Sequence, residues 1–306
     1  MTFNLNELAG IYGYRLEDIA SATGLDPASV NLNYARATRN QIEGFIEKTR
    51  ILIETNLSTR SSTENQRVFE AGWGENLALC RKNGVSTASL RPLYARRWEM
   101  IRYNNTLVLP ENPHVFEDLL HVSVALSFRH YLSAINPVYE FGCGTARFLY
   151  LLGSFFPEKE LNGLDWSESS VDLIKLIAQS GRKIHGHRFD MLNPDLDYSI
   201  KKDAGVFTIG ALEQLGNRFG PFLGYLLAQK PAIVVHHEPI IEFYDANLPL
   251  DQIAIDYHRK RGYLDGYLTE LRRLEADGKL RILKAQRTYY GDGYHESASL
   301  VVWQPA

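Results

Sequence analysis

Residues 137–165 read PVYEFGCGTARFLYLLGSFFPEKELNGLD, and this stretch decides the fold. It opens with a short apolar run of strand type, residues 138–141, which leads at once into the glycine turn of residues 142–144. Residues 148–156 have the apolar density of a buried helix face, and residues 161–164 have the composition of a second strand. A strand, a glycine turn, a helix and a second strand in this order predict a parallel pair with a right-handed crossover.

Two acidic residues stand at the ends of the two predicted strands. Asp165 closes the second strand, at the place where a carboxylate accepts hydrogen bonds from both hydroxyls of a ribose. Glu140 lies just before Gly142, where it is placed to meet a cationic amino group rather than a pyrophosphate. Arg147 occupies the position at which a dinucleotide fingerprint has its third glycine. The pattern therefore predicts a nucleoside site that is not built for a dinucleotide.

The run E-F-G-C-G-T-A, residues 140–146, resembles motif I of the class I S-adenosylmethionine (SAM) methyltransferases, D/E-x-G-x-G-x-G. Ala146 replaces the last glycine, a departure that the family often tolerates. The resemblance covers residues 137 to about 304. It implies a mostly parallel α/β sheet with an antiparallel last strand and SAM as the cofactor, whereas a Rossmann-like turn without a cofactor is the alternative. The implied cofactor residues are Glu140, Gly142, Gly144, Asp165, Trp166 (against the adenine ring), Asp190 (on its amino group) and Met191.

The composition excludes several other classes of function. With 306 residues, 45% hydrophobic and 23% charged, the chain has the composition of a globular protein. A formal charge of −3 gives no basic footprint, so we expect no nucleic-acid partner. Cys80 and Cys143 stand in unrelated contexts, which predicts neither a disulfide framework nor a thiolate metal cluster. No apolar run has the length of a membrane span and no signal peptide is evident, so we expect a cytoplasmic protein without membrane contact.

The chain divides into residues 1–109, predicted to be an α-helical accessory or lid region, and residues 110–306, predicted to be the SAM-binding domain. The first part shows no convincing strand alternation. Helical spacing or capping signals predict helices at residues 16–22, from Asp26-Pro27 through the apolar positions up to residue 53, at residues 68–80 and at residues 89–101. A bridging helix is predicted near residues 116–132.

Arginines and aromatic residues gather in residues 91–105, RPLYARRWEMIRYNN. In methyltransferases that act on small molecules, an N-terminal helical region commonly covers the substrate pocket. An arginine there can hold a substrate carboxylate with two parallel hydrogen bonds. We therefore expect an anionic small-molecule substrate, although a solvated helix face is the alternative; a homodimer stays open. At least one of Arg91, Arg96, Arg97 and Arg102 should face the substrate, and the substrate residues proposed are Arg91, Arg97, Tyr94 and Tyr103.

The remaining strands of the sheet follow in order after Asp165. Residues 183–188 are the predicted third strand, and residues 203–209 are the fourth, nearly continuous in apolar residues as a strand buried on both faces should be. Residues 232–235 are the fifth strand. A hairpin of residues 280–290 and 297–303 ends the chain, and in the class I fold this hairpin lies beside the fifth strand.

His236, His237 and Glu238 follow the fifth strand directly, and His295 in the last hairpin could approach them. His237, Glu238 and His295, with His236 as the substitute for His237, are predicted to bind one divalent metal such as zinc or iron(II). Strand alternation favours His236 with Glu238, but Pro239 forces the chain out of the sheet, so both histidines are kept. The alternative is that one histidine packs in the core and the others serve as hydrogen-bonding or acid–base groups.

This polar set is similar to that of the metal-dependent α-keto acid C-methyltransferases, including the 2-ketoarginine type. The resemblance implies that the metal chelates a 2-oxo acid and stabilises its enolate, which attacks the methyl group of SAM. His236, His237 and Glu213, in the loop after the fourth strand, are the catalytic candidates. Metal-free O-methylation of a small hydroxyl or carboxyl compound is one alternative. A SAM-binding regulatory protein is another, although so many buried polar groups are costly without a use.

Overall fold

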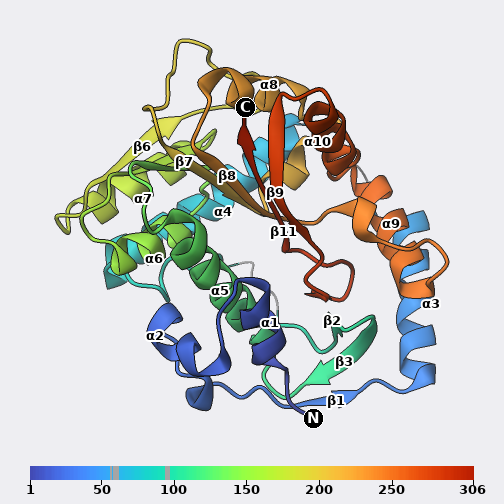
Figure 1. Ribbon diagram of the computed structural model, residues 1–306. Coiled ribbons are helices and arrows are strands. Elements are labelled where there is room, and N and C mark those ends of the chain that lie inside the picture. Colours follow the sequence, from blue (N-terminus) through green and yellow to red (C-terminus); the bar gives the residue numbers. More distant parts are fainter. Residues whose placement is uncertain (56, 58–61, 94–96) are drawn as a thin grey trace.

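Seven strands form the central sheet of the protein, whose computed structural model describes residues 1–55, 57, 62–93 and 97–306 (Figure 1). Their order is β6-β5-β4-β7-β8-β11-β9. The first five of these run parallel to one another, and β11 is antiparallel to both β8 and β9. The strands are β4 (Val138–Phe141), β5 (Leu161–Asp165), β6 (Ile184–Arg188), β7 (Gly205–Ile209), β8 (Ile233–Glu238), β9 (Leu280–Gln286) and β11 (Ser299–Pro305).

The strand order places the ligand edge of this sheet. Strands β6 to β8 follow the 3-2-1-4-5 order of doubly wound α/β sheets, in which ligands bind at the carboxyl ends where the order reverses. Here that reversal lies between β4 and β7. The antiparallel β11 pairs with β8, as the resemblance to the class I methyltransferases implied. The predicted fold class, a mostly parallel sheet with an antiparallel last strand, is confirmed.

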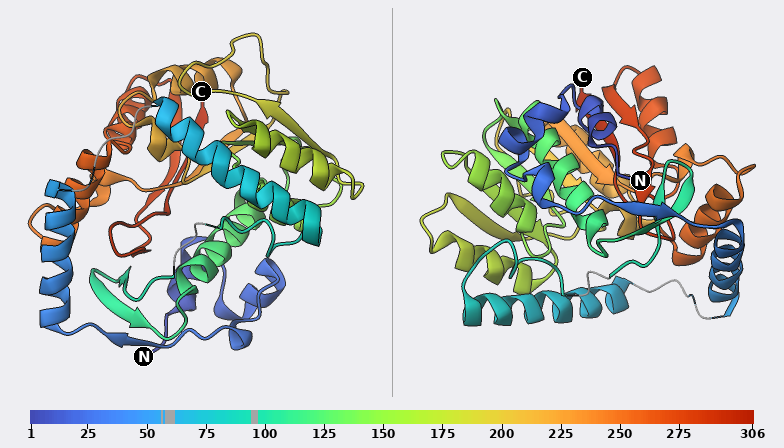
Figure 2. Two further views of the ribbon diagram at one scale, coloured as in Figure 1. Left: turned by 180° about the vertical axis from the view of Figure 1, so that it is seen from behind. Right: turned by 90° about the horizontal axis from the view of Figure 1, so that it is seen from below.

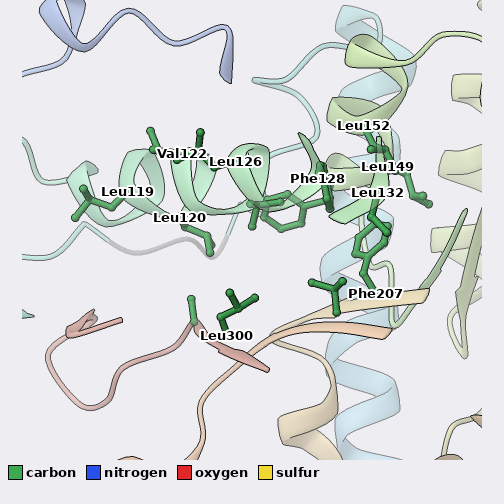
Figure 3. Close-up of a cluster of buried hydrophobic side chains, with 14 of the residues drawn as sticks. Leu119, Leu120, Val122, Leu126, Phe128, Leu132, Leu149, Leu152, Phe207 and Leu300 are labelled. Atoms are coloured by element: carbon green, nitrogen blue, oxygen red, sulfur yellow. The ribbon is translucent and has the colours of Figure 1, made fainter. Parts of the chain in front are cut away.

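One face of the sheet is covered by α5 (Val115–Ser127), α6 (Arg147–Phe155) and α7 (Glu168–Ala178). Leucine, valine and phenylalanine side chains from these helices and the strands form one hydrophobic core, part of which is drawn in Figure 3. Phe128, just after α5, lies against Phe207 of β7 with ring centroids 4.9 Å apart. The bridging helix predicted near residues 116–132 is thus the element that joins the N-terminal region to the sheet.

The other face is covered by α8 (Gly220–Gln229) and α10 (Tyr267–Ala276), which pack with the strands into a second core. Trp303 of β11 is fully buried there. The helix α9 (Pro249–Arg261) lies toward the N-terminal region and packs against α3 (Arg39–Thr55). The described helices include none that is long and apolar enough to cross a membrane.

The N-terminal region contains strands as well as helices, which corrects the prediction of a purely helical region. A small antiparallel sheet has the order β1-β3-β2-β10, and its last strand comes from the C-terminal hairpin. Strands of two to five residues are too short to show alternation, and β10 is remote in the sequence. The predicted boundary at residues 109–110 falls at the end of β3. The strands are β1 (Tyr34–Arg36), β2 (Ile101–Tyr103), β3 (Thr106–Pro110) and β10 (Tyr290–Gly291).

Two predicted helices of this region are wrong. Asp26 caps only a single 3-10 turn, and the long helix α3 begins later, at Arg39. Turns occupy residues 87–90, and β2 begins at Ile101, so the helix predicted at residues 89–101 is not found at residues 89–93 and 97–101, the part of this range that the structure describes. The remaining α-helices are α1 (Leu5–Ile11), α2 (Ile19–Thr23) and α4 (Ser62–Asn83). Short 3-10 segments are η1 (Leu16–Asp18), η2 (Pro27–Ser29), η4 (Leu212–Leu215) and η5 (Ile241–Phe243), and η3 (Phe128–Leu132) is a π-helical segment after α5.

Candidate functional site

The turn between β4 and α6 brings the motif backbone close to its neighbours. Gly142 has a φ of +69°, and a Cβ there would lie 2.4 Å from the Cβ of Ala211. Gly144 has a φ of +52°, and a Cβ there would lie 2.9 Å from the ring of Trp73. Both positions therefore require glycine, for backbone conformation and for space. The N–H of Gly142 donates to the carbonyl of Leu164 over 2.7 Å, which holds the turn to β5.

A cavity of about 240 Å³ lies at the carboxyl ends of β4, β5 and β7, where the strand order reverses. Every residue that the sequence predicted to contact a cofactor lines it: Glu140, Gly142, Gly144, Asp165, Trp166, Asp190 and Met191. Lining residues that the sequence did not predict as cofactor contacts include Phe69 and Trp73 of α4, Phe116, Glu117 and Leu120 of α5, Arg147 of α6, Gln214 and Ser297. The cavity is therefore enclosed by the sheet edge together with helices of both parts of the chain.

Asp165 is a buried carboxyl at the end of β5 that also shapes the glycine turn. Its Oδ2 accepts from the N–H of Gly144 over 2.8 Å, and its Oδ1 accepts from the N–H of Ser167 over 2.9 Å. Burial raises the pKa of Asp165 to about 6, although these two N–H groups act in the opposite direction. Each oxygen keeps a further lone pair, so the group can also accept from two hydroxyls of a ligand.

Glu140 is a buried carboxyl of β4 whose Oε2 has no hydrogen-bond partner. Burial raises the pKa of Glu140 well above its ordinary range, and the charge of Asp165 adds to this, whereas Arg147 opposes it. Arg147 itself is held by Glu117, whose Oε2 lies 2.5 Å from its Nη1. A buried carboxylate without a partner is costly. The wall of the cavity at Glu140 therefore suits a ligand that brings a positive charge.

Trp166, Asp190 and Met191 line another part of the same cavity. Asp190 accepts from the N–H of Leu192 over 2.9 Å and from Nδ2 of Asn193 over 2.8 Å, so its carboxylate is oriented by its own turn. The Cε of Met191 would lie 3.3 Å from a Cβ at Gly142, which places this side chain beside the glycine turn. This part combines an aromatic face, an apolar side chain and a fixed carboxylate.

His236 is fully buried in the core between β8 and α10. Its Nδ1 lies 2.8 Å from Oγ1 of Thr208, and its Nε2 lies 2.8 Å from the hydroxyl of Tyr267 and 3.1 Å from Nε1 of Trp303. Burial lowers the pKa of His236 to about 3, so the ring is neutral. Both of its nitrogens are engaged with core residues, and His236 is not among the described residues that line the cavity.

Glu238 is also fully buried and serves the loop after β7. Its Oε1 accepts from the hydroxyl of Thr208 over 2.7 Å and from the N–H groups of Ala211 and Leu212 over 3.0 Å each. Its Oε2 accepts from the N–H of Glu213 over 3.2 Å. Burial raises the pKa of Glu238 to about 7, and the charge of Glu213 adds to the rise. Glu238 therefore holds the loop that forms one wall of the cavity.

His237 points to the opposite face of β8, because strand β8 continues through Glu238 and neighbouring side chains alternate. It is fully buried, with its ring stacked at 6.3 Å between centroids on that of Tyr12, the residue after α1. Neither ring nitrogen has a hydrogen-bond partner among the described residues. Burial lowers the pKa of His237 to about 3. It does not line the cavity either.

His295 lies in the loop before β11, against α9. Its Nδ1 is 2.8 Å from Nε2 of His258, and its Nε2 is 3.3 Å from Oδ2 of Asp292. Burial alone would lower the pKa of His295, but the charge and hydrogen bond of Asp292 outweigh it and raise the pKa. Among the described residues, no group of three or more His, Cys, Asp or Glu side chains could hold a metal ion.

The predicted metal site is therefore not formed, and the reason is geometric. His236 and Glu238 share one face of β8 but are bound to other groups, His237 lies on the other face, and His295 belongs to a separate cluster.

The third catalytic candidate, Glu213, does lie beside the cavity. Its Oε1 accepts from Nε2 of Gln214 over 2.7 Å, and Gln214 lines the cavity. Burial raises the pKa of Glu213, although the nearby His295 opposes the rise. Ser297, another lining residue, donates to Oδ2 of Asp292 over 3.4 Å. Two wall residues are thus each backed by an acidic group.

The residues proposed to hold the substrate are spread over several places. Tyr103 accepts from the N–H of Asn4 over 2.9 Å and lines a separate cavity of about 170 Å³. Arg97 is exposed, whereas Arg91 is half-buried next to Pro92, which lines the main cavity. The predictions for Tyr94 and Arg96 lie outside the described residues.

Arg102 is buried away from the main cavity, which corrects the expectation that it could face the substrate. Its Nε donates to the carbonyl of Gly293 over 3.3 Å, and its Nη1 lies 3.7 Å from Oδ1 of Asp251. The Asp251 carboxylate in turn binds Arg287, which also pairs with Glu296. Arg102 thus ties β2 to α9 and the C-terminal hairpin.

No protein-family model matches this chain, and no curated protein matches it. Solved methyltransferase structures are remotely similar. The N-methyltransferase NodS from Bradyrhizobium japonicum WM9, in complex with S-adenosyl-L-homocysteine, aligns over 62% of this chain and 87% of its own at 16% identity and a TM-score of 0.44. The CcbJ methyltransferase from Streptomyces caelestis aligns over 78% of this chain and 99% of its own at 15% identity and a TM-score of 0.43. The magnesium protoporphyrin IX methyltransferase ChlM from Synechocystis PCC 6803, with bound SAM, aligns over 62% and 79% at 14% identity and a TM-score of 0.41. Likeness at this level carries no inference about substrate or mechanism.

Proposed function

We propose that this protein is a SAM-dependent methyltransferase that acts on a small molecule. The observation that carries the proposal is Glu140, a buried carboxyl with an unpartnered oxygen, in the same cavity as Asp165. SAM has an α-ammonium group at one end and a ribose diol in its middle, and these two carboxyls match the two groups in kind. When bound, SAM would supply an electrophilic methyl group.

The chain's own residues have separate tasks in this proposal. Glu140 receives the ammonium group, and the N–H groups that fix Asp165 orient its carboxylate toward the ribose hydroxyls. Trp166 and Asp190 meet the adenine ring and its amino group. The glycines at 142 and 144 let the turn pack closely on Ala211 and Trp73, which line the same cavity.

The methyl acceptor is proposed to enter at the part of the cavity formed by Gln214, Leu215 and Ser297. Glu213 is the proton acceptor in this proposal, because it is bonded to Gln214 and burial raises its pKa toward the working pH. His236 and His237 are not used for this role, since both are buried as neutral rings outside the cavity wall. Arg91, beside the lining residue Pro92, is the candidate partner for an anionic group of the acceptor.

Two acceptor chemistries compete, and the structure favours one of them. One is metal-assisted methylation of the carbon next to the ketone of an α-keto acid such as 2-ketoarginine, in which the metal stabilises the enolate. The proposed ligands His236 and Glu238 are bound to Thr208 and, in the case of Glu238, to backbone N–H groups. These side chains are held by bonds within the protein and do not fit a metal site. We therefore propose metal-free O-methylation of a small hydroxyl or carboxyl compound.

The test is a two-stage measurement on the purified full chain. Calorimetry should show binding of SAM and of S-adenosylhomocysteine but not of NAD, and binding of NAD alone would overturn the assignment. A methyl-transfer assay should then compare hydroxyl and carboxyl acceptors with α-keto acids, with and without a chelator. Turnover of the first group that survives the chelator supports O-methylation. Chelator-sensitive turnover of a keto acid would restore the metal-assisted route, and binding without any turnover would favour a regulatory protein.

A further inference from the structure

We propose that α4 is part of the cofactor site: Phe69 and Trp73 form the outer wall of the adenosine pocket, and Glu70 positions that wall. This inference rests on the proposed function, because it assigns residues of the N-terminal region to the same cavity. The ligand class is an adenine nucleoside, and Glu70 is a positioning residue that acts through the helix rather than by touching the ligand.

The first observation is the aromatic pair on α4. Phe69 and Trp73 are one helical turn apart, their ring centroids are 5.7 Å apart, and both line the cavity. Phe69 faces Trp166 across 6.5 Å between centroids. Trp73 packs on the glycine turn, since a Cβ at Gly144 would lie 2.9 Å from its ring. Flat aromatic faces on two sides suit a flat aromatic ligand such as adenine.

The second observation concerns Glu70, which lies between Phe69 and Trp73 in the sequence and fixes α4 to the start of α7. Oε2 of Glu70 accepts from the hydroxyl of Ser167 over 2.7 Å and from the N–H of Glu168 over 2.9 Å. Its Oε1 accepts from the hydroxyl and the N–H of Ser169 over 2.5 and 3.2 Å. A carboxylate that accepts four hydrogen bonds at a helix N-terminus is strongly held. Glu70 therefore caps α7 from another helix.

The hydrogen bonds of Glu70 connect it through Ser167 to Asp165, the carboxyl proposed to bind the ribose. Ser167, which donates its hydroxyl to Glu70, donates its backbone N–H to Asp165 over 2.9 Å. Burial alone would raise the pKa of Glu70, but the hydrogen bonds from Ser169 and Ser167 outweigh it and lower the pKa, so the group is ionised at neutral pH. Residues 69, 70 and 73 of one helix thus meet Trp166, the start of α7 and the glycine turn at the same time. Figure 2 shows α4 running along this side of the molecule beside α7.

The experiment compares two probes on the full chain at pH 8. S-Adenosylhomocysteine carries both the adenosine and the amino acid parts, whereas 5′-methylthioadenosine carries only the adenosine part. Asp165 is ionised at this pH, so the effect of the Glu70 charge on its pKa does not enter. We expect Glu70→Gln to weaken both probes by about tenfold, as the loss of a charged hydrogen-bond network implies. Phe69→Ala should weaken both by at least as much.

The control is Glu75→Gln, the same change at an exposed position of the same helix, which should leave both dissociation constants unchanged. Glu140→Gln should weaken S-adenosylhomocysteine but spare 5′-methylthioadenosine, which separates the two ends of the cavity. If Glu70→Gln unfolds, Ser169→Ala replaces it, because that change removes one bond to Glu70 and leaves α4 intact. Adding Ser169→Ala to Glu70→Gln should have no further effect.

The outcomes distinguish this inference from the proposed function. A wild-type protein that binds neither probe would overturn both. A wild-type protein that binds both, with Glu70→Gln and Ser169→Ala variants within twofold of it, would overturn the role of α4 alone. Binding of 5′-methylthioadenosine is expected to slow hydrogen–deuterium exchange in residues 62–83. Protection confined to residues 138–191 would count against the role of α4.

Discussion

Glu140 and Glu238 are both buried glutamates near the carboxyl ends of parallel strands, β4 and β8, yet their surroundings differ. Burial raises the pKa of both. Glu238 accepts hydrogen bonds from Thr208 and from three backbone N–H groups. Glu140 lines the cavity and keeps one oxygen, Oε2, without a hydrogen-bond partner. The protein itself thus satisfies the hydrogen-bonding capacity of the Glu238 carboxyl, whereas the Glu140 carboxyl keeps capacity for a ligand.

The largest loss of stability is expected at Glu238, whose carboxyl already has all of its hydrogen-bond partners within the protein. Glu238→Ala would leave the Thr208 hydroxyl and three backbone N–H groups without their acceptor, and should lower the free energy of unfolding by about 3 kcal/mol or more. The matched change Glu140→Ala removes a carboxyl that has one unpartnered oxygen, and should change the free energy of unfolding by less than about 1 kcal/mol. Urea unfolding of the two variants measures both. Equal losses of stability in the two variants would contradict the difference drawn between Glu238 and Glu140.

A smaller effect is expected for Asp165, which is partly satisfied by the protein and partly free for a ligand. Asp165→Ala should weaken SAM binding by about 1 to 3 kcal/mol, the usual loss for a charged hydrogen-bond partner. Calorimetry at pH 8 provides the measurement. Asp195→Ala is the control, because that carboxyl is exposed and accepts from the N–H of Asp197 in its own turn. Unchanged SAM affinity in the Asp165 variant would remove this residue from the cofactor site.

The pH dependence of ligand binding tests the role of the Asp165 carboxylate separately. Burial raises the pKa of Asp165 to about 6, and the ionised form is the one that accepts from ribose hydroxyls. Below this pKa the free protein must give up a proton on binding, so affinity for S-adenosylhomocysteine should fall by up to about tenfold per pH unit. Titrations between pH 5 and 8 test this. Asp165→Asn should reduce the slope, and the part that remains is expected from the deprotonation of Glu140 on binding.

The smallest effect is expected at Ala146, which occupies the last glycine position of the motif. Its φ of 58° is left-handed, which strains an alanine, but its methyl group is fully buried. In Ala146→Gly the relief of strain and the loss of packing oppose each other, so the free energy of unfolding should change by less than about 1 kcal/mol. Thermal unfolding measures it. A larger loss would show that the methyl group, and not the turn, determines this position.

Much of the cavity could be predicted from the sequence because its residues are close in the chain. Glu140, the glycines and Asp165 lie on a strand, a turn and the next strand, so the local fold brings them together. The order of strands also fixed where Asp190 would lie. For such residues, type and spacing determine position.

The metal ligands placed at the end of β8 are wrong because the strand was expected to end at residue 235, so that Pro239 made strict alternation an unreliable guide for His237. Strand β8 instead continues through Glu238, so alternation separates His237 from His236. The role of α4 could not be predicted, since Glu70 and Ser167 are almost a hundred positions apart and only the packing of α4 on α7 joins them. The spacing of Phe69 and Trp73 on one helix face was the only signal in the sequence.

The most direct test of the central claim is the proton balance of binding at the Glu140 carboxyl. Burial raises the pKa of Glu140 well above its ordinary range, and a bound ammonium group would lower it again. Calorimetric titration with S-adenosylhomocysteine, repeated in buffers of different ionisation enthalpy at pH 6.5, counts the protons exchanged. The account predicts proton release from the wild-type protein, with distinctly less release and weaker binding in Glu140→Gln. Equal proton release and equal affinity in the two proteins would contradict it.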